Sequence, residues 1–218
     1  VKGDIGGRGP VRNKPIIAQD GTWLAPASLE SEVWDAFVDL SRDQGQTWTM
    51  SRLVPVRHAG TEPEDGEGEE RPMALSSFQG KGIIQPTLWE SAPGAVHMLL
   101  RSTEGHIYRS DSEDGGYTWC PAYATDLPNN NSGIDLTKLD DGTLLLVYNP
   151  VPGNWAARTP LVVSSSRDNG RTWTEELVLE NEPGEYSYPA ILSQGNDVHI
   201  TYTWKRERIA YWHIAIGE

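Results

Sequence analysis

An eight-residue pattern that occurs three times constrains the fold of this chain more than any other feature. Residues 41–48 read Ser-Arg-Asp-Gln-Gly-Gln-Thr-Trp, and the Ser, Asp, Gly, Thr and Trp recur in the same places at 112–119 and 166–173. The Asp can accept hydrogen bonds from turn amides, the Gly can take a positive φ, and the Trp can fill apolar space between strands. Each octapeptide therefore predicts a compact turn. No carboxylate lies where a calcium loop needs its closing ligand, so we expect no metal there.

The same context precedes each octapeptide. Short apolar or alternating runs are separated by tight turns, for example at Asp20-Gly21 and Asp141-Gly142, and no segment keeps a helical period. A fourth copy ends without its octapeptide. Strand units of about 40–50 residues at even spacing are typical of propeller blades. We therefore predict an all-β propeller domain, or a fragment of one, over residues 1–218. Its four-stranded antiparallel blades are expected at roughly 12–52, 83–123, 133–177 and 186–214.

Composition excludes several classes of protein. The 218 residues carry 18 Lys and Arg against 31 Asp and Glu, a formal net charge of −13, which argues against nucleic-acid binding. No apolar run approaches the ~20 residues of a membrane span, and we find no signal peptide at the start. The single cysteine, Cys120, cannot form an internal disulfide. The compartment stays open. Residues 57–81 are acidic and Gly-rich, which predicts a solvated loop between blades or, alternatively, a lid over the site.

Strand direction predicts which residues surround the functional site. Successive strands of a blade run antiparallel, so the first turn of each blade and its octapeptide share one face. The segments that enter first strands and leave second strands share the other face, around the propeller axis. Cations, amides and aromatic rings gather there, a composition that suits an anionic sugar. The predicted substrate-binding residues are Arg12, Lys14, Gln85, Arg101, Asn130, Asn131, Ser132, Asn149, Arg158, Tyr188, Trp204 and Arg206. The alternative for each cation is a solvated loop residue, and for the Asn run it is turn chemistry.

The octapeptide resembles the Asp-box of the sialidase (neuraminidase) superfamily, also called the BNR repeat, and the resemblance extends from about Arg12 to Trp212. It implies a glycoside hydrolase that acts on terminal acidic sugars of an oligosaccharide or polysaccharide, without a cofactor. Sialidase-like propellers have six blades or more, so four copies imply part of a six- or seven-bladed propeller or an oligomer. We therefore expect either further blades of a longer chain or a second copy as a partner.

The resemblance also implies roles for individual residues. Sialidases place a Tyr-Ser pair before the first strand of a late blade, and Tyr186-Ser187 stands at the matching place. Tyr186 would be the nucleophile, with Glu30 or Glu185 as its base, and Arg101 and Arg158 would grip the carboxylate. The alternative is that Tyr186 or Tyr188 packs between blades.

The chain departs from the sialidase pattern, and other functions stay open. It has no Arg-Ile-Pro motif and no early Asp in a matching context. A polysaccharide lyase could use Tyr186 or His106 to remove the proton beside a uronate carboxylate. A non-catalytic propeller could bind a glycan without turnover. His97 and His199 lie within second strands, where we expect them to be packed.

Overall fold

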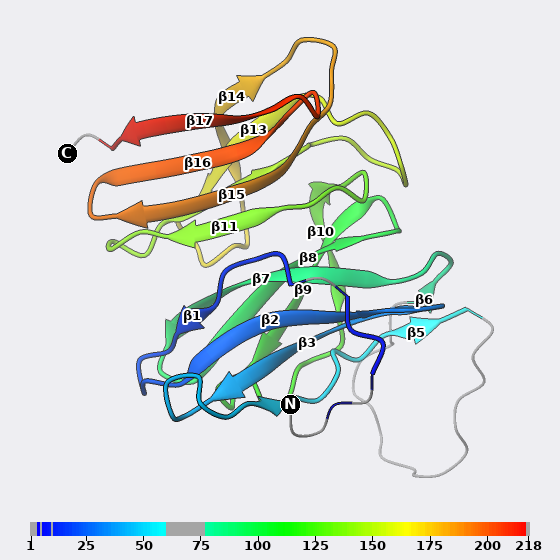
Figure 1. Ribbon diagram of the computed structural model, residues 1–218, viewed down its shortest axis with the longest axis vertical. Coiled ribbons are helices and arrows are strands. Elements are labelled where there is room, and N and C mark those ends of the chain that lie inside the picture. Colours follow the sequence, from blue (N-terminus) through cyan, green and yellow to red (C-terminus); the bar gives the residue numbers. More distant parts are fainter. Residues whose placement is uncertain (1–3, 5, 10, 60–76, 217–218) are drawn as a thin grey trace.

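The structure is a computed structural model that describes residues 4, 6–9, 11–59 and 77–216, and it confirms an all-β propeller (Figure 1). Blade 1 contains β1 (Ile16–Ile17), β2 (Trp23–Glu30), β3 (Trp34–Ser41) and β4 (Thr49–Met50). Blade 2 contains β7 (Ile83–Ala92), β8 (Ala95–Ser102), β9 (His106–Ser112) and β10 (Tyr123–Pro128). Blade 3 contains β11 (Asp135–Lys138), β12 (Leu144–Tyr148), β13 (Leu161–Ser166) and β14 (Thr174–Glu180). Blade 4 contains β15 (Tyr186–Gln194), β16 (Asp197–Trp204) and β17 (Arg208–Ala215).

Blade 4 has three strands in the described part of the chain, which agrees with a copy that ends without its octapeptide. All neighbouring strands within the blades are antiparallel. Two short strands, β5 (Arg57–His58) and β6 (Ser77–Phe78), pair in parallel. They flank most of the predicted acidic loop, of which residues 60–76 lie outside the described residues. No helix that could cross a membrane occurs in the part of the chain that the structure describes.

Alternating side chains pack each blade against the next. On β8, Val96, Met98 and Leu100 contact the blade 1 core, whereas Leu99 joins the core shared with blade 3. On β12, even-numbered leucines face blade 2, and Leu145 and Val147 face blade 4. The period of two is the pleat of a strand that is buried on both faces. Figure 1 shows the blades following one another in chain order, from blue β1–β3 to orange and red β15–β17.

The three octapeptides, here called Asp-boxes, have the predicted turn geometry. Asp168 Oδ1 accepts hydrogen bonds from Ser166 Oγ (2.8 Å) and the Thr172 amide (2.9 Å), while Oδ2 accepts one from Thr172 Oγ1 (2.6 Å). The other two boxes repeat these contacts. Each box Gly has a φ between +77° and +90°, a conformation that favours glycine. The box amide Gly115 donates to the Gly94 carbonyl in the first turn of its blade (2.9 Å), so boxes and first turns share one face as predicted.

The box carboxylates make the stability of the fold depend on pH. Hydrogen bonds from Thr47 and Ser41 lower the pKa of Asp43 to about 2, and those from Thr172 and Ser166 lower the pKa of Asp168. A pKa below the unfolded value of about 3.9 means that the stabilisation is complete above pH ~4 and is lost as the pH falls toward 2.

We therefore expect Asp43→Asn to lower the melting temperature at pH 6, with the difference from the parent chain shrinking below pH 4. Thermal unfolding followed by circular dichroism between pH 6 and 2 measures this. Glu113→Gln, an exposed carboxylate in the second box, is the control and should leave the curve unchanged. A difference for Asp43→Asn that stays constant down to pH 2 would contradict the assignment.

Candidate functional site

Three arginines from separate segments converge on one exposed tyrosine at the axial face. Arg12 precedes β1, Arg101 lies in β8, and Arg158 precedes β13. The Tyr188 ring centroid is 5.7 Å from the Arg12 guanidinium carbon and 5.0 Å from that of Arg158. Arg101 is close enough for its charge to act on Tyr188 and on both other arginines. This arginine cluster comprises Arg12, Arg101 and Arg158, and it is built from segments that only the folded propeller brings together.

Amide and carbonyl oxygens hold Arg101 in place. Its Nε donates to Asn131 Oδ1 (3.0 Å), Nη1 donates to Gln85 Oε1 (3.1 Å), and Nη2 donates to the Asn131 carbonyl. The side chain is buried at 4% exposure, and burial lowers the pKa of Arg101 to about 10. The guanidinium remains charged at neutral pH, with no carboxylate among these hydrogen-bond partners.

Arg12 is held in a similar way across the blade 3–blade 4 junction. It donates to Asn13 Oδ1, to the Ile134 carbonyl (2.6 Å) and to the Pro189 carbonyl (2.6 Å). Burial lowers its pKa to about 10, and its Nε has no hydrogen-bond partner within the described part of the chain. Gly133 makes room for it, because a Cβ there would lie 2.7 Å from Arg12 Cζ. A side chain at position 133 would therefore force this guanidinium to move.

Among the residues that the structure describes, Arg158 makes the one direct ion pair of the arginine cluster. Its Nη1 donates to Glu185 Oε1 (3.1 Å), and Glu185 Oε2 also accepts from the exposed Arg206 (2.8 Å). Burial alone would raise the pKa of Glu185, but the hydrogen bond from Arg206 and the charge of Arg158 outweigh it and lower the pKa. Glu185 thus stays ionised and orients Arg158 beside Tyr188.

Tyr188 is presented to solvent by an irregular start to β15. The β15–β16 register shifts between Ser187 and Ala190, and Tyr188 has a φ of +52° although it is not a glycine. Such bulges re-aim side chains, and backbone strain of this kind clusters at functional sites. Tyr188 is 44% exposed. Burial alone would raise its pKa, but the hydrogen bond and charge of Arg158, with the charges of Arg101 and Arg206, lower it.

The structure separates the predicted tyrosines. Tyr186 is 1% exposed in the core between blades 3 and 4, where its ring contacts Trp204 edge-on. The nucleophile predicted at Tyr186 therefore stays a prediction, and of the two rings it is that of Tyr188 that lies exposed beside the arginines. The sequence contains one signal for the exposed position of Tyr188. The pair Tyr188-Pro189 occupies the same point of a first strand as Gln85-Pro86, and Gln85 likewise has a positive φ, of +54°.

Four of the predicted binding residues are buried next to the arginine cluster rather than exposed at its surface. Asn130, Asn131, Ser132 and Asn149 are at most 2% exposed. Ser132 Oγ lies within hydrogen-bond distance of Asn130 Oδ1 (2.5 Å) and Asn149 Oδ1 (2.8 Å) and can donate to one of them at a time, and Asn131 Nδ2 donates to Asn154 Oδ1 (2.9 Å). Their predicted contact with a ligand stays a prediction, and in the structure their side chains are buried among protein partners. They position Arg101 and the loop around 154.

The remaining predicted residues divide between site and scaffold. Lys14 Nζ pairs with Asp135 (2.9 Å) and joins blades internally. Trp204 lies beneath Lys205 and Arg208. Glu30 accepts hydrogen bonds from Ser28 Oγ (2.8 Å) and from Gln85 Nε2 (3.4 Å). Because Gln85 Oε1 accepts a hydrogen bond from Arg101, Gln85 links Glu30 to Arg101. Among the described residues, no group of three or more His, Cys, Asp or Glu could hold a metal ion.

The titration of Tyr188 tests this geometry. Burial raises the pKa of Tyr108, Tyr123, Tyr148 and Tyr202, so Tyr188 should ionise ahead of them. In an ultraviolet difference titration we expect Tyr188→Phe to remove an early phenolate transition. Arg158→Gln should move that transition to higher pH, because it removes the hydrogen bond and charge that favour the phenolate. A titration curve whose early part is the same in Tyr188→Phe and the parent chain would contradict the cluster.

Comparisons with known proteins place this fold. The Hadza microbial sialidase Hz136 is similar over 95% of this chain, with a TM-score of 0.71 and 18% identity. The NanB sialidase from Streptococcus pneumoniae is similar over 92% of this chain, with a TM-score of 0.63 and 15% identity. The Trypanosoma rangeli sialidase is similar over 87% of this chain, with a TM-score of 0.61 and 14% identity. This chain spans 37%, 30% and 28% of the lengths of those proteins.

At these identities the likeness shows the fold alone. A search of curated proteins finds no match. The family description "BNR repeat-like domain" matches residues 4–200. With three Asp-boxes in their turns and a sialidase-type arrangement of blades, the chain belongs to the BNR repeat-like domain family.

Proposed function

We propose that this chain is a sialidase-like glycoside hydrolase that acts on terminal carboxylate-bearing sugars. The observation that carries the proposal is the convergence of Arg12, Arg101 and Arg158 on Tyr188. Among the described residues, one of these three guanidiniums, that of Arg158, has a direct carboxylate partner. Positive charge therefore remains at the axis of a protein whose formal net charge is −13. Arginine forks bind carboxylates in two-point fashion, so a sugar acid supplies the missing negative charge.

Tyr188 fits the role of nucleophile for such a sugar. When the carboxylate sits on the anomeric carbon, an anionic carboxylate nucleophile is repelled, whereas a tyrosine hydroxyl is tolerated. The lowered pKa of Tyr188 favours loss of its proton. In the proposed reaction Tyr188 loses its proton and its Oη bonds to the anomeric carbon as the glycosidic C–O bond breaks, and the leaving alcohol takes a proton from water. A water molecule then displaces the tyrosine from the anomeric carbon, and its proton returns to the phenolate.

Two carboxylates have distinct parts in this proposal. Glu185 is occupied by Arg158 and Arg206 and has a lowered pKa, so it serves to hold Arg158. Glu30 is linked through Gln85 to Arg101 and is the carboxylate we assign to accept the Tyr188 proton. The exposed Trp155, tied to Asn130 through its backbone amide (3.3 Å), offers a ring on which a sugar face could stack.

Paired substitutions of the two tyrosines test the mechanism. With 4-methylumbelliferyl sialoside and glucuronide as probes, Tyr188→Phe should lower kcat at least ~100-fold, as expected when a group that reacts with substrate is lost. Binding of the free sugar acid should be retained, because the arginines remain. Tyr186→Phe is the matched control, and it should keep turnover because its ring lies in the core.

The reverse ranking of the two variants would contradict the assignment of Tyr188. Absence of turnover in the parent chain, with sugar-acid binding retained, would indicate a non-catalytic glycan-binding propeller. An unsaturated uronate product, recognised by its ultraviolet absorption, would indicate a lyase instead.

A further inference from the structure

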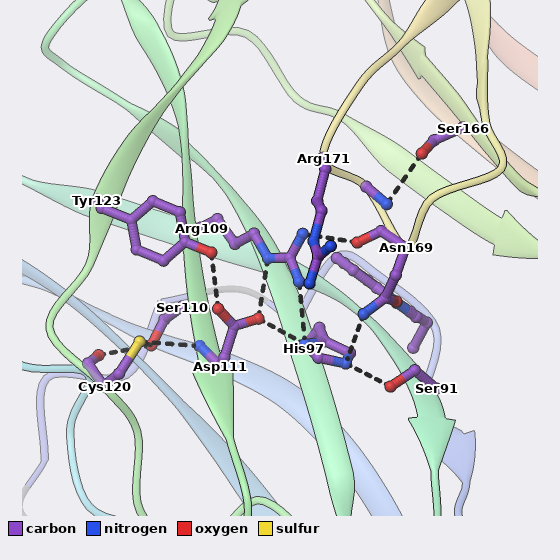
Figure 2. Close-up of polar contacts among 12 residues, drawn as sticks. Ser91, His97, Arg109, Ser110, Asp111, Cys120, Tyr123, Ser166, Asn169 and Arg171 are labelled. Atoms are coloured by element: carbon purple, nitrogen blue, oxygen red, sulfur yellow. Dashed lines mark hydrogen bonds and ion pairs between the residues drawn. The ribbon is translucent and has the colours of Figure 1, made fainter.

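A second group of reactive side chains lies at the opposite end of blade 2, on the Asp-box face. Figure 2 shows Ser91, His97 and Asp111 in line. Ser91 Oγ is 2.7 Å from His97 Nε2, and His97 Nδ1 is 2.5 Å from Asp111 Oδ1. A hydroxyl, an imidazole and a carboxylate in this order are the parts of an activated serine nucleophile.

The sheet register brings these three residues together. His97 in β8 pairs directly with Trp89 in β7 and with Asp111 in β9. A register shift between Glu90 and Ala92 places Ser91 at a bulge near the end of β7. The imidazole also stacks on the Trp89 ring at 5.0 Å, which fixes its plane. His97 is therefore packed, as the sequence suggested, and hydrogen-bonded on both ring nitrogens.

The hydrogen bonds assign the tautomer of His97. Burial alone would raise the pKa of Asp111, but hydrogen bonds from His97 and Tyr123 and the charge of Arg109 lower it to about 2. Because Asp111 is ionised, Nδ1 carries the proton and donates it to Asp111. Nε2 is then an acceptor, which agrees with the two donors that face it: Ser91 Oγ, and Asn169 Nδ2 at 3.2 Å. The lone pair of Nε2 is thus available to take a proton from Ser91.

Neighbouring groups hold the carboxylate and balance its charge. Tyr123 Oη donates to Asp111 Oδ2 (2.7 Å), and Arg109 Nε donates to Asp111 Oδ1 (2.9 Å). Arg109 Nη2 also lies 3.2 Å from His97 Nδ1. The arginine charge opposes a positive imidazolium and the carboxylate favours it, so Asp111 must remain in place for His97 to accept a proton.

Asn169 supplies a donor beside the nucleophile. Trp89 Nε1 donates to Asn169 Oδ1 (2.7 Å), which turns the amide nitrogen toward His97 and Ser91. The fold itself does not require asparagine at this Asp-box position, because Gln44 and Gly115 occupy it in the other boxes. A side-chain amide next to an attacking serine can stabilise a developing oxyanion.

Ser91 opens onto a polar hollow. The hollow has a volume of about 420 Å³ and is lined by Ser91, Lys138, Thr143, Arg167 and Asn169, among others. Ser91 is exposed, whereas His97 is 8% exposed, so the hydroxyl can meet a ligand while the base stays shielded. Polar walls that include Lys138, Arg167 and the carboxylate of Asp141 suit the ester of a polar alcohol rather than of a lipid.

We propose that Ser91, His97 and Asp111 form a second catalytic site that hydrolyses short-chain carboxylic esters of polar alcohols. Ser91 Oγ bonds to the ester carbonyl carbon while its proton moves to His97 Nε2. The ester C–O bond then breaks, and the alcohol leaves with that proton. Water attacks the acyl-serine, passes a proton through His97 to Ser91, and releases the carboxylic acid. The oxyanion formed in each half of the reaction faces the Asn169 amide.

Covalent labelling and ester hydrolysis test the site in the full chain. We expect a fluorophosphonate to form one adduct, which peptide mapping assigns to Ser91, as the serine oxygen displaces fluoride from phosphorus. Hydrolysis of p-nitrophenyl acetate should fall at least ~100-fold in Ser91→Ala and in His97→Gln, the loss expected without nucleophile or base. Ser91 is exposed, so its substitution should leave the melting temperature unchanged.

Ser193→Ala is the matched control, because Ser193 Oγ contacts Thr137 Oγ1 (2.9 Å) and the Lys138 carbonyl near the same hollow and has no histidine partner. This variant should keep both labelling and hydrolysis. The proposal is overturned if the parent chain shows no adduct at Ser91. It is also overturned if Ser91→Ala hydrolyses the ester as fast as the parent chain, or if His97→Gln is labelled at Ser91 at the parental rate.

Discussion

The burial of guanidinium groups at the blade junctions is the interaction on which the axial site depends. Arg12 and Arg101 are desolvated strongly enough to lower their pKa to about 10, yet their hydrogen-bond partners are carbonyl and amide oxygens. A buried donor without a partner is costly, and among the described residues acceptors in fixed places meet these guanidinium N–H groups, except at Arg12 Nε. Asn131 supplies two of the acceptors of Arg101, and Asn13 with the carbonyls of Ile134 and Pro189 supplies those of Arg12. The result is a site in which two charged guanidiniums are held by neutral oxygens rather than by carboxylates.

Strand β8 connects the two sites of the molecule. His97 and Arg101 lie four residues apart on the same face of this strand, at about 3.3 Å per residue, so they stand about 13 Å apart. Leu99 between them is buried in the core shared with blade 3. The packing of blade 2 on blade 3 therefore fixes both the arginine at the axial face and the imidazole at the Asp-box face. Each site also includes an asparagine from blade 3 or the segment that enters it. Asn131 contacts Arg101 at the axial face, and Asn169 contacts His97 at the Asp-box face.

Much of the fold could be predicted from the sequence, because the Asp-box repeats and the strand pleat are local patterns. Antiparallel order alone placed Arg101, Arg158 and Tyr188 on one face, and they do meet there. The resemblance favoured Tyr186 as the nucleophile, but the exposure of Tyr188 and the burial of Tyr186 could not be predicted, since they depend on a register shift between Ser187 and Ala190. The Ser91–His97–Asp111 line was missed for a related reason. Its members are six and fourteen residues apart, and only the strand register shows that they pair.

Calorimetric titration with N-acetylneuraminic acid and with its methyl ester tests most directly whether the arginine cluster is a carboxylate site. The two ligands have the same sugar ring and differ in the charge that the guanidiniums would bind. We predict that the acid binds at least ~10-fold more tightly than the ester, a difference of about 1.4 kcal/mol or more. Equal affinity for the acid and its ester would contradict the account.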